Sequence, residues 1–128
     1  MQTNMQELLF WLYFTNAIFL INHEIDSAYW HEWNLFKIKG GITTFLILHF
    51  PLLFFVLFGL IQVNNQTYAG LIYSLILSVI GIFAFIIHMI FIKQGHKEFK
   101  TASSLFILSG ILLISVIQFI LTAILLNN

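Results

Sequence analysis

The chain has no cysteine, no arginine, a single proline and few charged residues of any kind. The absence of cysteine excludes disulfides, thiolate metal ligands and cysteine nucleophiles. Five lysines balance five acids, so the chain lacks the dense basic surface that nucleic-acid binding requires. Apolar residues are abundant instead: they make up 60% of the 128 residues and give a mean hydropathy of +0.97. This composition predicts an integral membrane protein.

The apolar residues fall into four stretches, each close to the roughly 20 residues that a helix needs to cross a bilayer. Short polar gaps separate the stretches, and none has the charged face of a soluble helix bundle. We therefore predict one domain over residues 1–128, an all-α integral membrane bundle of four transmembrane helices. The predicted spans are about 8–25, 42–63, 68–92 and 102–126. No Lys or Arg precedes the first stretch, so we expect it not to be a cleaved signal.

Positive charge is confined to two of the connections between these stretches. Lys37 and Lys39 lie in the first connection, and Lys93, Lys97 and Lys100 lie in the third. Because loops rich in lysine remain on the cytoplasmic side, we expect this face to be cytoplasmic. Both termini are then predicted to be non-cytoplasmic.

The first connection contains aromatic residues that alternate with polar ones. The aromatic set is Tyr29, Trp30, Trp33 and Phe36, and the polar set is His31, Glu32, Asn34 and Lys37. This pattern predicts a short interfacial segment between the first two helices, with the aromatic residues toward the membrane and the polar residues toward water. Such a segment is an anchor or a lid, and Gly40-Gly41 would give a lid its hinge.

Small and polar residues recur at helical spacing in the third and fourth spans. They are Ser74, Ser78, Gly81 and His88 in the third span and Ser115, Gln118 and Thr122 in the fourth. Small residues let membrane helices approach closely, and polar side chains can hydrogen-bond to a neighbouring helix. We interpret both sets as packing faces.

Three histidines lie inside different spans, toward the lysine-rich face. His23 ends the first span, whereas His49 lies ~12 Å and His88 ~7 Å from the ends of their helices at 1.5 Å per residue. Ionisable residues are costly in a bilayer, so their presence there is a functional-site hypothesis. Three imidazoles beside carboxylates suit Zn²⁺, Fe²⁺ or Mn²⁺. We predict a divalent metal site with His23, His49 and His88 as ligands.

The remaining roles fall to nearby acids and a loop histidine. Asp26 follows His23 by three residues on the same helix face, and His96 in the third connection can fold over the site. We predict that Asp26 or His96 completes the ligand set. Glu24 is rotated from His23 by about 100°, which favours a role as general base. The predicted function is metal-dependent hydrolysis or oxidation of a lipid or another amphiphile at the membrane face.

Other functions fit the same residues. The histidines and acids could handle protons without a metal, or only stabilise helix packing. At the level of the protein, the alternatives are an oligomeric transporter or channel subunit and a non-catalytic structural subunit. Small multidrug transporters have a similar size but use a glutamate within their first helix. Here Glu7 lies at the extreme outer end of the first span, which argues against that match.

Two motifs resemble a known family. One runs from Ile21 to Trp30 (INHEIDSAYW) and continues through EWNLF to Gly40-Gly41; the other is LHFP at residues 48–51. Together they resemble a family of small, functionally uncharacterised bacterial membrane proteins over most of the chain. The resemblance implies a four-helix membrane protein, here expected in the bacterial inner membrane, and implies no activity. The His-Glu-x-Asp run is also loosely similar to HxxEE-type motifs suggested to bind metal, but it departs from that pattern.

Overall fold

The computed structural model describes residues 1–128, and all of its regular secondary structure is helical. The helices are α1 (Gln2–Tyr29), α2 (Glu32–Leu35), α3 (Gly41–Asn64), α4 (Tyr68–Lys93) and α5 (Ala102–Leu126). All except the single turn of α2 are long and apolar enough to cross a membrane. The predicted all-α membrane bundle of four spanning helices, with a short segment between the first two, is therefore confirmed.

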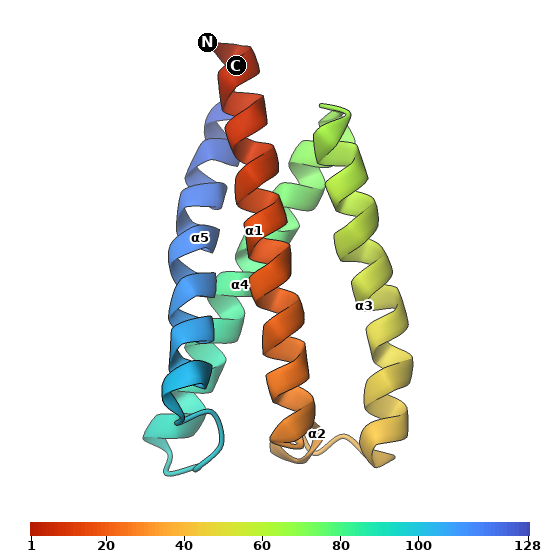
Figure 1. Cartoon of the computed structure of the whole chain (residues 1–128), viewed down its shortest axis with the longest axis vertical. Coiled ribbons are helices and arrows are strands. Elements are labelled where there is room, and N and C mark those ends of the chain that lie inside the picture. The colour runs from red at the N-terminus through yellow and green to blue at the C-terminus, as the bar shows by residue number, and fades with distance from the viewer.

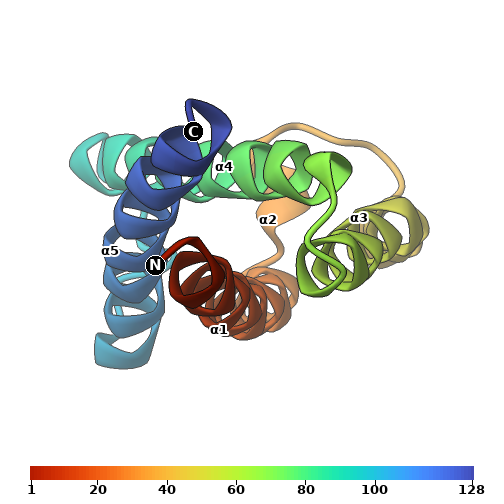
Figure 2. The same ribbon diagram turned by 90° about the horizontal axis from the view of Figure 1, so that it is seen from above.

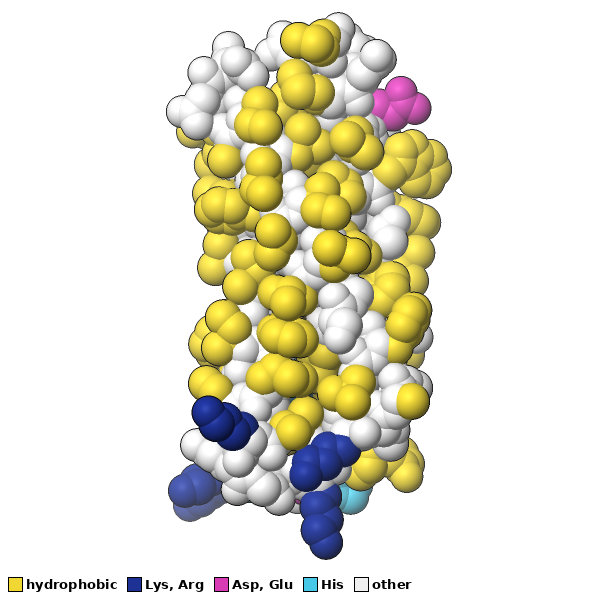
Figure 3. Space-filling model, turned by 90° about the vertical axis from the view of Figure 1, so that its left-hand side faces the viewer, with side chains coloured by type: hydrophobic (Ala, Val, Ile, Leu, Met, Phe, Trp, Pro, Cys, Tyr) yellow, Lys and Arg dark blue, Asp and Glu magenta, His cyan; other side chains and the backbone are white.

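The four long helices form a ring in which each packs mainly against two neighbours (Figures 1 and 2). Helix α1 contacts α3 and α5, and α4 contacts the same two helices from the other side. Successive helices run in opposite directions, so both termini lie at one end and α2 lies at the other. Lysine side chains gather at the α2 end, below a largely apolar surface (Figure 3).

The residues at the helix ends explain where the spans begin and stop. Gly40 and Gly41 have φ angles of 101° and 60°, which glycine adopts without steric cost, and α3 begins there. Thr67 and Thr101 cap α4 and α5 by accepting a hydrogen bond from the backbone N–H three residues later. Helix α1 does not end at residue 25 but continues to Tyr29, so the polar motif near its end is helical.

A buried polar network joins α1, α4 and α5. Asn16 Nδ2 donates to Ser115 Oγ at 3.0 Å and to Gln118 Oε1 at 2.9 Å. Gln118 Nε2 in turn donates to Ser74 Oγ at 3.0 Å, and the hydroxyls of Ser74 and Thr122 are 2.8 Å apart. Every side chain of this network is buried. The small and polar faces of α4 and α5 thus pack against each other, as their spacing predicts.

Two further contacts hold the helices close together. Gly81 of α4 lies so near α5 that a Cβ at this position would collide with Ser115 Oγ. On the opposite side of the ring, the Tyr13 hydroxyl of α1 donates to the backbone oxygen of Val56 in α3 at 2.8 Å. These contacts fix the spacing of the helices that position the polar end of the bundle.

Candidate metal centre

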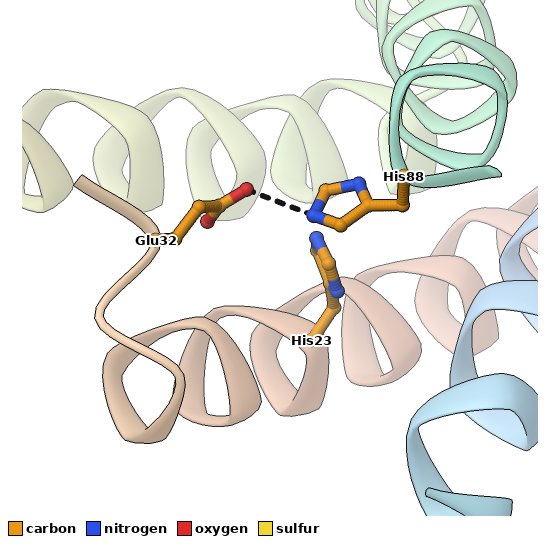
Figure 4. Close-up of side chains that lie close together, drawn as sticks. All are labelled: His23, Glu32 and His88. Carbon is orange, nitrogen blue, oxygen red and sulfur yellow. Dashed lines mark ion pairs between the residues drawn. The ribbon is translucent and has the colours of Figure 1, made fainter. Parts of the chain in front are cut away.

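Three side chains from three helices meet at the α2 end of the bundle. His23 of α1, Glu32 of α2 and His88 of α4 each offer one ligand atom, and these atoms all lie within 4.8 Å of one another. Figure 4 shows the two imidazoles and the carboxylate turned toward a common point. His23 and His88 are each 2% exposed, and the Glu32 side chain is 12% exposed. The group could hold a metal ion.

The backbone of α4 orients the His88 ring. Its Nδ1 lies 2.6 Å from the carbonyl oxygen of Ala84 and donates to it, which leaves Nε2 free to face Glu32. Nε2 is 3.0 Å from Glu32 Oε1, yet the two atoms do not have hydrogen-bond geometry. Two ligands of one ion are arranged in this way, because both point at the ion and not at each other. A histidine ligand usually donates its other ring nitrogen to a carbonyl or carboxylate, as His88 does.

Several polar atoms around this point are buried and have no hydrogen-bond partner. They include His23 Nδ1 and Ser27 Oγ as well as His88 Nε2. Each buried donor or acceptor left unpaired costs about 1–3 kcal/mol. A cation bound among the ring nitrogens and the carboxylate would offset part of this cost.

Two imidazoles and one carboxylate are a known ligand set for catalytic zinc and for non-haem Fe²⁺. Both metals then keep at least one coordination position open for water or substrate. Ligand atoms about 2.0–2.2 Å from a tetrahedral ion lie roughly 3.3 Å apart. The three ligand atoms all lie within 4.8 Å of one another, which is near that spacing, so the residues fit a metal ion.

The charge state of Glu32 also suits a cation. Burial acts to raise the pKa of this carboxyl, but the neighbouring imidazoles of His88 and His23 act in the opposite direction and hold that pKa below its usual range. Glu32 is therefore an anion at neutral pH. Its charge is available to a metal or to a protonated imidazole.

Phe99 covers the group from the connection between α4 and α5. Its ring centroid lies 4.4 Å from that of His88 and 5.7 Å from that of His23, and the residue is only 1% exposed. Phe99 has a φ of 63°, an unfavourable backbone conformation for a bulky residue. Strain of this kind persists where surrounding contacts impose it, and here it places an aromatic ring over the imidazoles.

Glu24 and His49, which the sequence analysis assigns as base and ligand, form a separate pair. His49 Nε2 lies 2.5 Å from Glu24 Oε2, between α3 and α1. His49 Nδ1 lies 2.6 Å from the Phe45 carbonyl oxygen. The pair thus holds a proton between Nε2 and the carboxylate. His49 does not belong to the group formed by His23, Glu32 and His88.

The other two predicted ligands also lie outside this group. Asp26 is half-buried, and its Oδ2 has no hydrogen-bond partner. The imidazole of His96 is 44% exposed, with Nδ1 3.8 Å from Glu98 Oε2 and its ring against Phe91. The structure therefore brings together His23 and His88 of the predicted set. The assignment of all these residues as ligands stays a prediction.

Glu32 is the member of the group that was not among the ligands predicted from the sequence. Alternation with aromatic residues placed it on the water side of the interfacial segment, whereas the structure turns it inward. The reversal follows from the backbone at His31, whose φ of 52° interrupts the helix between Tyr29 and α2. The sequence contained only a weak signal for this role, because Glu32 is an acid in a connection that is rich in aromatic residues.

Comparison with known proteins identifies a family and no individual relative. No curated protein and no solved structure matches the chain. One family model matches residues 9–125, which include all of α3 and α4, α1 from Leu9 onward, α5 except its last residue, and every residue of the candidate centre. The chain therefore belongs to the family described as "Family of unknown function (DUF6713)".

Proposed function

We propose that this protein binds one divalent metal ion at the α2 end of its helix bundle and uses it for chemistry on a membrane amphiphile. The ion would be held by His23, His88 and Glu32. The observation that carries the proposal is the meeting of two buried imidazoles with an ionised carboxylate, all within 4.8 Å. Zn²⁺ and Fe²⁺ are the metals that this ligand set favours, with Mn²⁺ a weaker candidate.

A divalent ion at this place would supply Lewis-acid chemistry and an activated water, or redox chemistry in the case of iron. The chain's own residues would orient the ligands and limit the access of water. Ala84 fixes the His88 ring, and Phe99 covers the imidazoles. Glu24, held by His49 on the neighbouring helix, is our candidate for the general base.

The amphiphile follows from where the group lies. The ligands come from the ends of α1 and α4 and from α2, next to the lysine-bearing end of the bundle. This is the level of lipid headgroups if the helices cross the bilayer along the long axis of the bundle. A water-soluble substrate would gain nothing from a site at this depth.

We further propose that the lysine-bearing end faces the cytoplasm of a bacterium, with both termini outside. The natural absence of cysteine makes this simple to test, because one introduced cysteine is the only thiol. Thiol labelling of intact cells with a membrane-impermeant maleimide should modify Thr3→Cys and spare Lys97→Cys. The reverse pattern would invert the orientation and place the metal group outside.

Metal content is the direct test of the proposed function. The protein would be purified in detergent through a tag without histidine and analysed for zinc, iron and manganese. We expect about one equivalent in the wild type, because three ligands suffice for a catalytic site. His23→Ala, His88→Ala and Glu32→Ala should each lose it.

Matched controls separate this group from the rest of the predicted ligands. His31→Ala changes an exposed imidazole that stacks on Trp33, and His96→Ala changes another exposed one, so both should retain the metal. His49→Ala should retain it as well. Loss of metal in His49→Ala would instead support the ligand set predicted from the sequence, which includes His49. No metal in the wild type, even after reconstitution with each ion under reducing conditions, would contradict the proposal.

One observation favours a second candidate, proton handling by an oligomeric transporter or channel subunit. Glu24 and His49 share a proton within the membrane region, on neighbouring helices. Proton-coupled flux into proteoliposomes, lost in His49→Ala and independent of added metal, would support it. A purely structural role predicts lower stability in the histidine variants with neither metal nor flux.

A further inference from the structure

The candidate centre is closed to solvent in this structure. His23 and His88 are each 2% exposed, and the Glu32 side chain is 12% exposed. Phe99 covers the two imidazoles from the connection between α4 and α5, and α2 closes the centre on the side of Glu32 (Figure 4). A metal ion or a substrate can therefore reach the ligands only when one of these covering elements moves.

Of the two covering elements, α2 is the one less firmly bound to the bundle. It is a single turn of four residues, none of which is buried. The main-chain hydrogen bonds of residues 31–38 all have their partners within residues 28–38, so none ties this segment to α3 or α4. The connection that carries Phe99 is held more firmly, because Phe99 is fully packed and Thr101, two residues later, caps α5.

The backbone on both sides of α2 has the conformation expected of hinges. His31 before the turn and Lys37 after it have φ angles of 52° and 55°, which are unfavourable for residues with a side chain. Such angles persist only where surrounding contacts impose them. Gly40 and Gly41 follow, and glycine adopts a positive φ freely. The backbone therefore favours release of α2 unless side-chain contacts hold it in place.

The segment contacts the long helices through two aromatic rings and a carboxylate. The Trp33 ring lies 5.4 Å from that of Phe45 in α3, and the Phe36 ring lies 5.5 Å from that of Phe91 in α4. The carboxylate of Glu32 faces the buried imidazoles but makes no hydrogen bond with them. This polar attachment is incomplete until a proton or a cation lies between the carboxylate and an imidazole nitrogen.

We propose that α2 is the gate of the candidate centre and that a bound cation holds it closed. In the metal-free protein α2 swings away from the bundle about His31 and Lys37 and exposes the imidazoles of His23 and His88. A divalent ion has these imidazoles and Glu32 as ligands in the closed state but loses Glu32 in the open state. It therefore binds the closed state more tightly and shifts the population toward it. The gate itself requires no metal, whereas its closure by an ion rests on the metal site proposed above.

A crosslink between α2 and α4 tests the gate without metal. Phe36→Cys and Phe91→Cys, in a chain with no other cysteine, would be joined by dibromobimane. Opening is detected with diethylpyrocarbonate, which modifies accessible imidazoles, and the modified residues are identified by mass spectrometry. We expect His88 to react in the metal-free protein before crosslinking and at least about tenfold more slowly afterwards, because the open state is no longer populated.

Matched controls separate gating from general protection. Phe54→Cys and Phe58→Cys replace two exposed rings that stack on α3, and crosslinking them should leave the reaction of His88 unchanged. The exposed His96 should react equally in all samples. An equal rate for His88 before and after the crosslink from α2 to α4 would overturn the proposal and assign access to the connection that carries Phe99. No reaction of His88 in either sample would also overturn it, because α2 would then not open.

Hydrogen exchange tests closure by the ion in the chain without introduced cysteines. A single helical turn does not keep its hydrogen bonds once it is detached, so opening exposes the amides of residues 34–38 to exchange. Zinc should slow their exchange by about tenfold in the wild type and not in Glu32→Ala, whereas the amides of α5 should not respond.

The outcomes distinguish this proposal from the metal site itself. Zinc that binds without slowing exchange in residues 34–38 would overturn closure by the ion and leave the metal site standing. If no zinc binds, the proposed function fails together with closure by the ion. The crosslinking experiment then still decides whether α2 is a gate.

Discussion

His49 and His88 are anchored in the same way on neighbouring helices. In each, Nδ1 lies 2.6 Å from the backbone carbonyl oxygen four residues earlier, and Nε2 faces a glutamate from the first part of the chain. A neutral imidazole that donates from Nδ1 has only a lone pair on Nε2. A lone pair directed at a carboxylate is repelled, so each pair needs a proton or a metal ion between its members.

The two pairs meet this need differently. At His49 the partner atoms are 2.5 Å apart in a hydrogen bond, which leaves room for a proton and none for an ion. At His88 the partner lies 3.0 Å away without hydrogen-bond geometry, and a second imidazole, His23, joins the group. The first arrangement is suited to holding a proton and the second to binding a cation.

Glu32, and not Asp26, should be the carboxylate that sets metal affinity. Glu32→Gln retains the shape of the side chain but removes the charge beside His88. Changes to residues outside the ligand set already weaken metal binding by roughly 10–100-fold. We therefore expect Glu32→Gln to lower zinc affinity by more than about 100-fold and Asp26→Asn to lower it by less than about tenfold. Calorimetric zinc titration of both variants measures the difference. Equal losses would place Asp26 among the ligands.

His49→Ala should destabilise the protein without changing its metal content. It leaves Glu24 without its partner in an apolar setting, and we expect a loss of about 1–3 kcal/mol in the free energy of unfolding. Adding Glu24→Gln should recover part of this loss, because the charge is then absent. Unfolding by SDS titration provides the measurement, with the exposed His31→Ala as control. A double variant less stable than His49→Ala would show that the pair does not act as a unit.

Gln118→Leu should weaken the packing of α5 against α1 and α4. It removes the hydrogen bonds that join Gln118 to Asn16 and to Ser74, and such bonds between membrane helices contribute about 0.6–2 kcal/mol each. The same SDS titration should detect this change, whereas Ile117→Leu on the exposed side of α5 should have little effect. Addition of Asn16→Ala should cost less in Gln118→Leu than in the wild type. If the losses of stability in Asn16→Ala and Gln118→Leu added fully in the double variant, the two side chains would not belong to one hydrogen-bond network.

Gly81→Ala should force α4 and α5 apart. The new methyl group would collide with Ser115 Oγ, and overpacking of this kind costs about 1–3 kcal/mol. Ser115→Ala in the same chain should restore part of the stability, while Ser109→Ala on an exposed position should not change it. Thermal unfolding in detergent compares the variants. A neutral Gly81→Ala would mean that Ser115 or the helix spacing accommodates the methyl group without cost.

Phe99→Ala should open the candidate centre. The ring lies over both imidazoles, so its removal admits water and should speed zinc release to a chelator by about tenfold. Phe99→Gly should speed zinc release to a similar extent. It should also relieve the backbone strain at this position, because glycine tolerates a positive φ. Phe106→Ala truncates an exposed aromatic residue elsewhere and is the control. Unchanged release rates would mean that Phe99 does not limit access to the centre.

The spanning helices were predictable from local properties of the chain. Length, hydropathy and capping residues act over a few neighbouring positions, so the stretches near residues 42–63, 68–92 and 102–126 matched helices closely. The first prediction was too short at both ends, because polar residues at the membrane surface continue a helix that hydropathy alone cannot detect. The burial of Ser74 and Gln118 on packing faces also followed from helical spacing.

The sequence by itself determined that four apolar helices with polar inner faces would place histidines and acids at one end of a membrane bundle. Only the tertiary structure decided which acid meets which imidazole. His88 lies far from His23 and Glu32 in the sequence, and the meeting of the three residues depends on the turn at His31 and on the packing of α4 against its neighbours. His49 is separate from them for the same reason, since the packing of α3 against α1 places its imidazole against Glu24. Hydropathy and periodicity report the depth and face of a residue, whereas partner choice is set by contacts between helices.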